Sequence, residues 1–478
     1  MVARVIGWSA WLPGARGEQA LRERLRSGEP SFERLPELRW SWEVFEPEMP
    51  PGHARCERGA TLGEPEVDWR SLKLPPLSVA RMHAMEKVAL EVMASALRDA
   101  GVEPRGPMGE RVRVYLAATT LGPDPRTDHG RRIRRHELAR PVAAALRAHA
   151  PERAEEVSDY VDSLFNLLAP PVEPDSMMSS ASILAGRICN LWDLRGGHVA
   201  IDGSTASSLA AIEAAMEDLA DGACDVALVA AVSPMLTPSG MLALAHRGLL
   251  GADSPRPFAA DSQGALLGEG AVALVLDRGA VERGAVPDAR TRGWIEAVAG
   301  ATLPRRGRRR LRDAVAHACS AAFELAGVPA EEAAFVASRA SGMASVERDE
   351  GAALADVFGS AAREGGLPLA CHAAIFGHLG PASGFAATLD ALMALEAGSL
   401  HAPPLSPSPL GGAAREDLPP GLRVGATDLA LPPDARAGVS DGSTMSDAAP
   451  PAPPRKASRP VVCCRPAGAS DGSTVPSG

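Results

Sequence analysis

Thr205, Arg339 and His378 are the residues of this chain whose types and positions could do chemistry. Thr205 begins an expected helix, Arg339 follows an expected strand at 335–338, and His378 stands in a Gly-His-Leu sequence. A threonine hydroxyl has no accessible anion near pH 7, so it needs a general base before it can attack a carbonyl. One histidine supplies such a base in other folds, and acyl transfer or hydrolysis is therefore one interpretation. An arginine stays protonated and can only hold an anion.

Each of the three residues also has a structural interpretation. Helix starts favour threonine, charged side chains are mostly solvated or ion-paired, and a lone histidine is more often a structural residue than a catalyst. The structural interpretation is favoured for Thr205 and Arg339, while the two interpretations of His378 stand about even.

The composition indicates a globular protein that buries a substantial core. Of the 478 residues, 46% are hydrophobic and 23% are charged, and apolar runs such as 226–232 are far too short to span a membrane. The first residues do not form a signal peptide. We therefore expect a cytoplasmic protein without a membrane segment.

Cysteine usage and charge exclude further classes. The seven cysteines are odd in number and irregularly spaced, which indicates reduced thiols and neither a disulfide framework nor a zinc site. The net charge of -10 argues against nucleic-acid binding. No cofactor or metal is expected. Two basic clusters, at 131–135 and 305–312, stand out locally, and solvated loops are the simplest interpretation of both.

The elements that position these residues alternate between strand and helix. Apolar patterns predict strands at 2–6, 111–118, 198–202 and 226–232, with one helix through Met85, Ala89, Val92 and Ala96 and another after Thr205. The alternation resumes near residue 270, and its segments are strands at 271–276, 294–299, 335–338 and 422–426 and helices at 312–326 and 384–397. This order predicts an α/β protein of two halves, at 1–265 and 266–448.

Two segments stand outside this alternation. Residues 449–478 are rich in Pro, Ala, Ser and Gly and are expected to be disordered. Residues 120–180 are expected to be a partly helical insertion over the fold, and its length suggests a lid or a subunit contact.

Two sequence segments carry a resemblance to a known family. The stretch 186–212 contains Gly-Arg-Ile-Cys-Asn and Asp-Gly-Ser-Thr-Ala-Ser-Ser-Leu, and 256–270 contains Arg-Pro-Phe-Ala-Ala-Asp and Gly-Glu-Gly. The chain resembles β-ketoacyl synthases, most closely those of iterative polyketide and polyunsaturated-fatty-acid synthases. The resemblance implies a thiolase-like fold of two βαβαβαββ-type halves in an α/β/α/β/α layered arrangement.

The resemblance also shows which catalytic groups are replaced. The nucleophilic cysteine of the family matches Thr205, and the histidine of its His-Gly-Thr-Gly-Thr segment matches Arg339. The Lys-Ser-Asn-Ile-Gly-His-Leu segment matches 373–379, which keeps His378 but has Ala373 for the lysine. One of the four groups therefore survives.

Other matches around these groups are uneven. Glu347 and Glu350 stand where the family has an Asp-x-x-Glu pair, whereas 436–445 keeps only one glycine of the glycine-rich C-terminal turn. Cys371 and His372 precede the matched segment at offsets that do not suit substitute catalysts.

The resemblance leaves three functions open. The first is a non-condensing subunit, similar to chain-length factors that pair with an intact ketosynthase. The second is an active acyltransferase that uses Thr205 with His378, and the third is an acyl-binding scaffold. An intact ketosynthase gene beside this one would favour the first function, and isolation from any such gene would favour the third.

Expected partners follow from the same resemblance. Acyl carrier protein is acidic, so the clusters at 131–135 and 305–312 are candidate docking sites for it. A homodimer, or a heterodimer with an intact ketosynthase, is expected to form by pairing of the strand at 226–232 across a two-fold axis.

Overall fold

The computed structural model places both predicted halves around one large sheet. It describes residues 2–36, 56–118 without 64, 83 and 104, 140–168, 181–278 without 235, 252–254, 260 and 261, and then 286, 289–302, 311–359, 366–400, 422–424, 429–440 and 461–465.

The strands of the first half lie in the order β6-β5-β7-β8-β1. β6, β5 and β7 are parallel, while β8 is antiparallel to both β7 and β1. The strands are β1 (Ala3–Leu12), β5 (Val112–Ala118), β6 (His198–Ile201), β7 (Val226–Pro234) and β8 (Glu269–Arg278).

The second half repeats this arrangement in the order β11-β10-β15-β16-β9, with β13 added beside β11. β11, β10 and β15 are parallel, while β16 is antiparallel to both β15 and β9. These strands are β9 (Gly293–Ala299), β10 (Ala333–Ser338), β11 (Leu367–Ala370), β13 (Leu422–Val424), β15 (Arg436–Ser440) and β16 (Val461–Arg465). Pairing of β1 with β9 joins the halves, and β2 (Ala15–Arg16), which pairs with β1, is the twelfth strand of the sheet. The shared strand order therefore supports the two-half organisation for which the sequence shows no visible repeat.

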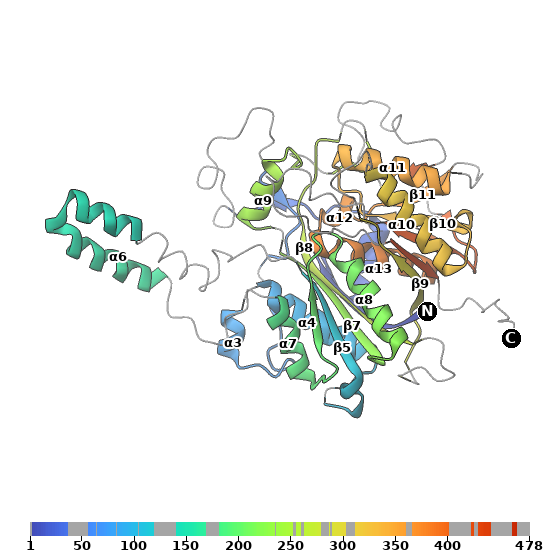
Figure 1. Cartoon of the computed structure of the whole chain (residues 1–478), viewed down its shortest axis with the longest axis horizontal. Helices are drawn as coiled ribbons and strands as arrows, with labels where there is room; N and C mark the ends of the chain where they lie inside the picture. Colours follow the sequence, from blue (N-terminus) through green and yellow to red (C-terminus); the bar gives the residue numbers. More distant parts are fainter. Residues whose placement is uncertain are drawn as a thin grey trace.

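Helices pack around the central sheet (Figure 1). α4 (Ala84–Asp99) and α7 (Ala181–Trp192) pack on the first half, and α10 (Leu311–Ala326) and α11 (Ala344–Phe358) cover the second. α8 (Ser207–Asp221) and α13 (Ser383–Ala397) share one core with strands of both halves. The predicted α/β class and layered arrangement are confirmed.

Burial explains why α13 occupies the central layer. All of its residues from Ser383 to Leu395 are buried, so it has no polar face to turn toward solvent. α4 instead buries the predicted stripe of Met85, Ala89, Val92 and Ala96 against the sheet.

The remaining elements are short or peripheral. They are β2 (Ala15–Arg16), α1 (Glu18–Ser27), β3 (Glu33–Arg34), β4 (Arg58–Gly59), α3 (Pro76–Arg81), η1 (Pro107–Arg111), η2 (Pro151–Arg153), α6 (Ala154–Leu168), α9 (Pro238–Ala245), η4 (Ala330–Glu332), α12 (Ala373–Phe376), η5 (Gly380–Ala382), β12 (Ser399–Leu400) and β14 (Leu429–Ala430). Within the described ranges, no helix is both long and apolar enough to cross a membrane.

The strand at 226–232 does not have the position that dimer pairing requires. It forms β7, which is bonded to β5 on one side and to β8 on the other, so it has no free edge. The outer strand of this half is β6, whose His198 and Ala200 are exposed. The expectation about β7 was wrong because an apolar strand is equally typical of the centre of a parallel sheet.

Two segments bear on the boundaries expected from the sequence. β8 begins at Glu269 and pairs with β7, so we propose that the division between the halves lies after β8. Within the expected disordered tail, 461–465 forms β16 between β15 and β9. Its Val-Val-Cys-Cys core has the β-branched character of a strand, which the composition of the whole tail obscured.

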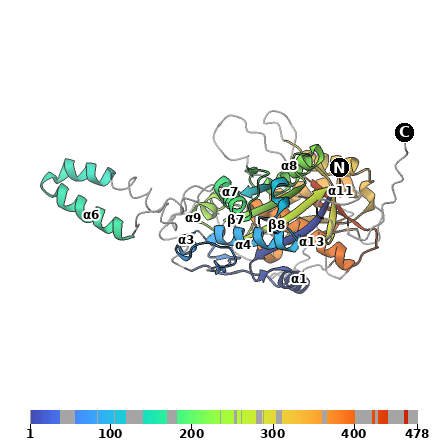
Figure 2. The ribbon, with the colours of Figure 1, turned by 90° about the horizontal axis from the view of Figure 1, so that it is seen from below.

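The described part of the 120–180 insertion is a helical hairpin. A helix at 140–149 leads through η2 into α6, and both views show this hairpin standing off from the sheet, not over it (Figures 1 and 2). Val142 and Tyr160 are exposed large hydrophobic residues on it.

Candidate functional site

Thr205 lies in a constrained turn between β6 and α8. Ser204 has a φ of 59°, a left-handed conformation that is uncommon for a residue other than glycine. The Asp202 carboxylate accepts a hydrogen bond from the Ser204 N–H at 3.1 Å, and the Ser207 hydroxyl donates to the Ser204 carbonyl at 2.6 Å. These contacts hold Thr205 immediately before the first turn of α8.

The Thr205 hydroxyl is buried and makes no hydrogen bond to the described residues. The residue is 3% exposed, and its Oγ1 has no hydrogen-bond partner among the described residues. The position of Thr205 at the helix start predicted that its hydroxyl would cap α8, but it does not. No general base among the described residues contacts this hydroxyl. A buried hydroxyl left unpaired costs about 1–3 kcal/mol.

The start of α8 lies against the start of α13. A Cβ added to Gly384 would come within 2.6 Å of the Ser208 Oγ and 2.7 Å of the Leu209 Cγ, so only glycine permits this approach. Ser208 and Ser383 are buried, and their hydroxyls also have no partner in the described part of the chain. Two helix N-termini with free hydroxyls thus meet at one end of the central layer.

Arg339 and His372 lie at the carboxyl edge of the second half. β10 pairs Ala337 with Ala370 of β11 in parallel, so Arg339 and His372 each stand two residues beyond a register pair. Both are buried, and the Arg339 N–H donates to the Ser440 carbonyl at 3.2 Å. Ligand sites of parallel sheets lie at this edge.

His378 is fixed by the Gly-Glu-Gly segment that the sequence singled out. Its N–H donates to the Leu266 carbonyl at 2.7 Å, and its carbonyl accepts from the Gly268 N–H at 3.0 Å. A Cβ at Gly268 would lie 2.0 Å from the Phe376 carbonyl oxygen, so this bridge requires glycine. The two motifs are therefore one structural unit.

Both histidines are neutral at physiological pH. Burial, with a smaller contribution from the nearby Arg339 charge, lowers the pKa of His372 to about 3. Burial also lowers the pKa of His378 to about 3, with contributions from Arg339 and His372. Neither ring nitrogen of His372, nor Nδ1 of His378, has a described partner. The structure thus places Arg339 and His378 in one cluster. It also places His372, which the sequence analysis had set aside, in this cluster.

Sequence reasoning set His372 aside because of its offset from the matched segment. The signal that could have identified His372 is its position directly after β11, because β11 pairs with β10, the strand that precedes Arg339. That strand, β11, is only four residues long and begins Leu-Pro, so its pattern is weak.

Glu347 and Glu350 lie beneath this group on α11. The Glu347 carboxylate accepts the N–H of Phe258 at 2.6 Å and that of Gly342. Burial raises the pKa of Glu347 to about 7, while these bonds and the Arg339 charge oppose the rise. The Ser338 hydroxyl donates to Glu350 at 2.9 Å. The carboxylates thus tie the chain at Phe258 and the end of β10 to the site.

No alternative nucleophile is evident in the described residues near this group. Burial raises the pKa of Cys371 well above the ordinary thiol value, and Glu347, Glu350 and Asp390 raise it further, so the thiolate is suppressed. Ala373, at the family's lysine position, is buried and apolar. In the described part of the chain, no cluster of three His, Cys, Asp or Glu residues could hold a metal ion.

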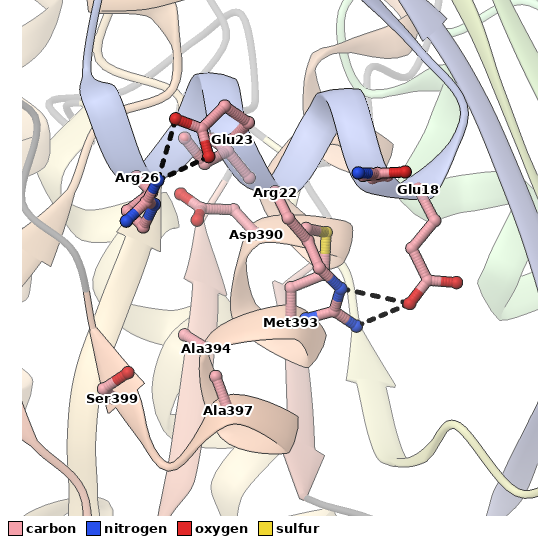
Figure 3. Close-up of a pocket in the computed structure, with 11 residues that line it drawn as sticks. Glu18, Arg22, Glu23, Arg26, Asp390, Met393, Ala394, Ala397 and Ser399 are labelled. Atoms are coloured by element: carbon pink, nitrogen blue, oxygen red, sulfur yellow. Dashed lines mark hydrogen bonds and ion pairs between the residues drawn. The ribbon is translucent and has the colours of Figure 1, made fainter.

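A separate pocket of about 570 Å³ lies between α1 and α13 (Figure 3). Charged side chains of α1 form one wall, and Met393, Ala394 and Ala397 form the apolar part of another. Arg22 pairs with Glu18 at 2.8 Å, and Arg26 pairs with Glu23 at 2.6 Å. The pocket lies toward the C-terminal end of α13, whereas the site lies at its start.

Comparisons with known proteins agree with this geometry. Residues 3–281 match the N-terminal domain of beta-ketoacyl synthases, and residues 304–404 match the C-terminal domain. The chain belongs to the β-ketoacyl synthase family. Polyketide synthase ThaG of Burkholderia thailandensis is 26% identical over 413 residues, which cover 84% of this chain and 7% of the relative. Pikromycin polyketide synthase component PikAII of Streptomyces venezuelae is 27% identical over 57% of this chain and 6% of its own length.

Solved ketosynthases share the fold of this β-ketoacyl synthase family member. The ketosynthase from module 6 of the bacillaene synthase from Bacillus subtilis 168 superposes with a TM-score of 0.72 at 19% identity and covers 97% of this chain and 72% of its own. The ishigamide ketosynthase/chain length factor gives a TM-score of 0.71 at 18% identity and covers 98% and 99%. The fold is thiolase-like, as predicted. The chain spans only a small fraction of the curated polyketide synthases it matches.

Proposed function

We propose that this chain is a ketosynthase-like subunit that does not itself form carbon-carbon bonds and that acts with an intact ketosynthase. The observation that carries the proposal is Thr205, which stands in the turn before α8 where the family has its cysteine. A cysteine there would gain acidity from the helix N-terminus, but a threonine hydroxyl gains no useful anion at neutral pH. Its Oγ1 also has no described hydrogen-bond partner.

The second half of the site supports the same proposal. Arg339 replaces a histidine, and a permanently charged guanidinium cannot be a neutral donor or a base. The apolar Ala373 replaces a lysine. His378 is retained, and as a neutral imidazole it can donate a hydrogen bond. The cysteine, the second histidine and the lysine that act with it in the family are replaced here. Loss of the chemical groups with retention of the whole fold fits a supporting subunit.

Partners follow from the proposed role. An intact ketosynthase of the same fold would dock on the free edge of β6, and an acyl carrier protein would deliver the acyl chain. Arg312, at the end of one basic cluster, pairs with Asp356 at 2.6 Å, while residues 303–310 and 131–135 lie outside the described residues. Docking of the carrier at either cluster therefore remains a proposal from charge alone.

Two other functions make different demands on the site. Acyl transfer by Thr205 with His378 requires a hydrogen bond from the hydroxyl to a base, and the described residues contain no such contact. A scaffold that only binds acyl groups requires neither catalysis nor a ketosynthase partner.

A reconstitution experiment separates these functions. The full chain, a candidate intact ketosynthase, and the mixture are each supplied with acyl and malonyl carrier proteins, and condensed product is measured. We expect product from the mixture, none from this chain alone, and altered chain length or amount when this chain is omitted. Condensation by this chain alone would contradict the proposal, as would a ketosynthase whose products do not respond to it.

A further inference from the structure

The pocket between α1 and α13 has charged residues on one side and apolar residues on the other (Figure 3). Its volume of about 570 Å³ lies within the range of roughly 300–1,000 Å³ that is typical of small-molecule sites. It lies toward the C-terminal end of α13, and neither Thr205, Arg339 nor His378 lines it. The pocket is therefore separate from the candidate site at the start of α13.

The apolar side of the pocket comes from Leu25 of α1 and from the last two turns of α13. Met393 and Ala394 are only 5% and 7% exposed, so this surface is largely shielded from bulk water. The Met393 side chain is unbranched and flexible, and such a thioether adapts to guests of different shape. Covering this apolar surface with an aliphatic chain is favourable, because it removes apolar area of both partners from water.

The charges on the α1 side are matched within the protein. Arg22 donates to Glu18 at 2.8 Å and also pairs with Glu396, and Arg26 pairs with Glu23 at 2.6 Å (Figure 3). A charged guest would have to compete with one of these partners for its counter-ion. The ion pairs thus give an uncharged guest an advantage over a cation or an anion.

An anion is disfavoured further by the surroundings of the apolar surface. Asp390, which is 8% exposed, lines the pocket, and the C-terminal end of α13 carries the negative end of the helix dipole. Gln19 and Ser399 are the uncharged polar residues of the lining. Their amide and hydroxyl groups can each donate and accept a hydrogen bond, so they suit an uncharged polar group on the guest.

We propose that this pocket binds an aliphatic chain that ends in an uncharged hydrogen-bonding group such as a hydroxyl. The chain lies over Met393, Ala394 and Ala397, and its polar end contacts Gln19 or Ser399. The inference goes beyond the proposed function, because the pocket shares no lining residue with the candidate site. It assigns to this chain a second binding site that takes no part in condensation.

Isothermal titration of the full chain with 1-nonanol tests the proposal. We expect saturable binding of one molecule per chain, and about tenfold weaker binding of 1-heptanol, which is shorter by two methylene groups. Nonanoate, which replaces the hydroxyl end with an anion, should bind at least about tenfold more weakly than 1-nonanol at neutral pH. No saturable binding of 1-nonanol would overturn the site, and equal or tighter binding of nonanoate would overturn the uncharged guest.

Variants identify the residues. Ala397→Trp fills the pocket from an exposed position of α13 and should abolish 1-nonanol binding, whereas Ala148→Trp, exposed on the helical hairpin, should not. Glu23→Gln releases Arg26 and should strengthen nonanoate binding by about threefold while 1-nonanol binding stays unchanged. A folded Ala397→Trp protein that still binds 1-nonanol would contradict the assignment, and an unchanged affinity for nonanoate in Glu23→Gln would contradict the role of the ion pairs.

Photolabelling tests the unaltered chain and does not depend on the folding of a variant. A nonanol that carries a diazirine in mid-chain, followed by illumination and peptide mass spectrometry, should label α1 or the last two turns of α13. Excess 1-nonanol should prevent the label, and labels confined to other peptides would overturn the site. None of these measurements involves condensation or a partner subunit, so a failure of the proposed function would leave their outcomes unchanged.

Discussion

Arg339 and His372 stand at equivalent positions on neighbouring parallel strands, each two residues past the register pair of Ala337 and Ala370. This places a permanent cation beside an imidazole that is already buried. Burial, and to a smaller extent this cation, lowers the pKa of both His372 and His378 and keeps them neutral. Where the sequence resemblance places a neutral histidine, this chain has a charge, and this charge makes His378 harder to protonate.

The two histidines predict a loss of stability in acid. Their folded-state pKa values of about 3 lie below the ordinary value of 6.5, so as pH falls below 6.5 the unfolded chain binds protons that the folded chain does not. Each histidine should then remove roughly 1 kcal/mol of unfolding free energy per pH unit. His378→Asn should therefore lose about 1 kcal/mol less than wild type between pH 6.5 and 5.5, measured by urea unfolding. His149→Asn, on an exposed helix, is the matched control, and an unchanged slope in His378→Asn would contradict the assignment.

Glu347 predicts the opposite slope. Its folded-state pKa of about 7 exceeds the ordinary 4.5, so its contribution is complete below pH 4.5 and is lost as pH rises to 7. Relative to Glu347→Gln, wild type should lose about 3 kcal/mol of unfolding free energy over this window. Urea unfolding at pH 5 and 8 checks it. A wild-type-minus-variant difference that does not change with pH would show that Glu347 is ionised throughout.

We predict that position 268, whose backbone hydrogen-bonds to His378, does not tolerate a side chain. A Cβ there would overlap the Phe376 carbonyl oxygen, and backbone atoms cannot move aside cheaply. We expect Gly268→Ala to lower the unfolding free energy by about 1–3 kcal/mol or more. Gly186→Ala in α7, where the nearest described atom is 3.4 Å away, should be neutral or stabilising. Equal effects of the two substitutions would show that the bridge is not tightly packed.

The free edge of β6 predicts where a partner subunit docks. The Val114 N–H donates to the Gly197 carbonyl, so the alternation of a parallel ladder turns the Ala200 N–H outward. Ala200→Pro should remove this donor and shift a dimer toward monomer in light scattering, while Ala200→Gly should not. Exposed Ile183 on α7 adds apolar surface to the region. A wild type that stays monomeric, alone and with an intact ketosynthase, would refute edge pairing.

The sequence predicted the elements with strong periodicity and the motifs that carry the site. α4, α8, α10 and α13 lie where their apolar patterns placed them, and Arg339 lies near enough to His378 to influence its pKa. Short elements were harder to predict. β11 and β15 have four and five residues, which is too few for a periodic signal.

Long-range relationships account for the other differences. Whether β7 is central or at an edge depends on β8, which pairs with it from more than 30 residues away, and no local pattern encodes that neighbour. His372 acquires its place only because β11 pairs with β10. The Thr205 hydroxyl was expected to cap a helix, but the left-handed Ser204 turns the chain so that Ser207, not Thr205, bonds within the turn.

Intact-protein mass spectrometry of the wild-type chain, after incubation with an acyl thioester of coenzyme A or carrier protein, tests the central claim most directly. We expect no acyl adduct, because no thiolate stands before α8 and no described base contacts the Thr205 hydroxyl. Thr205→Cys should acylate slowly and still fail to condense malonyl units, since Arg339 and Ala373 remain. A stoichiometric adduct on wild-type Thr205 that disappears in Thr205→Val would contradict the account and establish an acyltransferase.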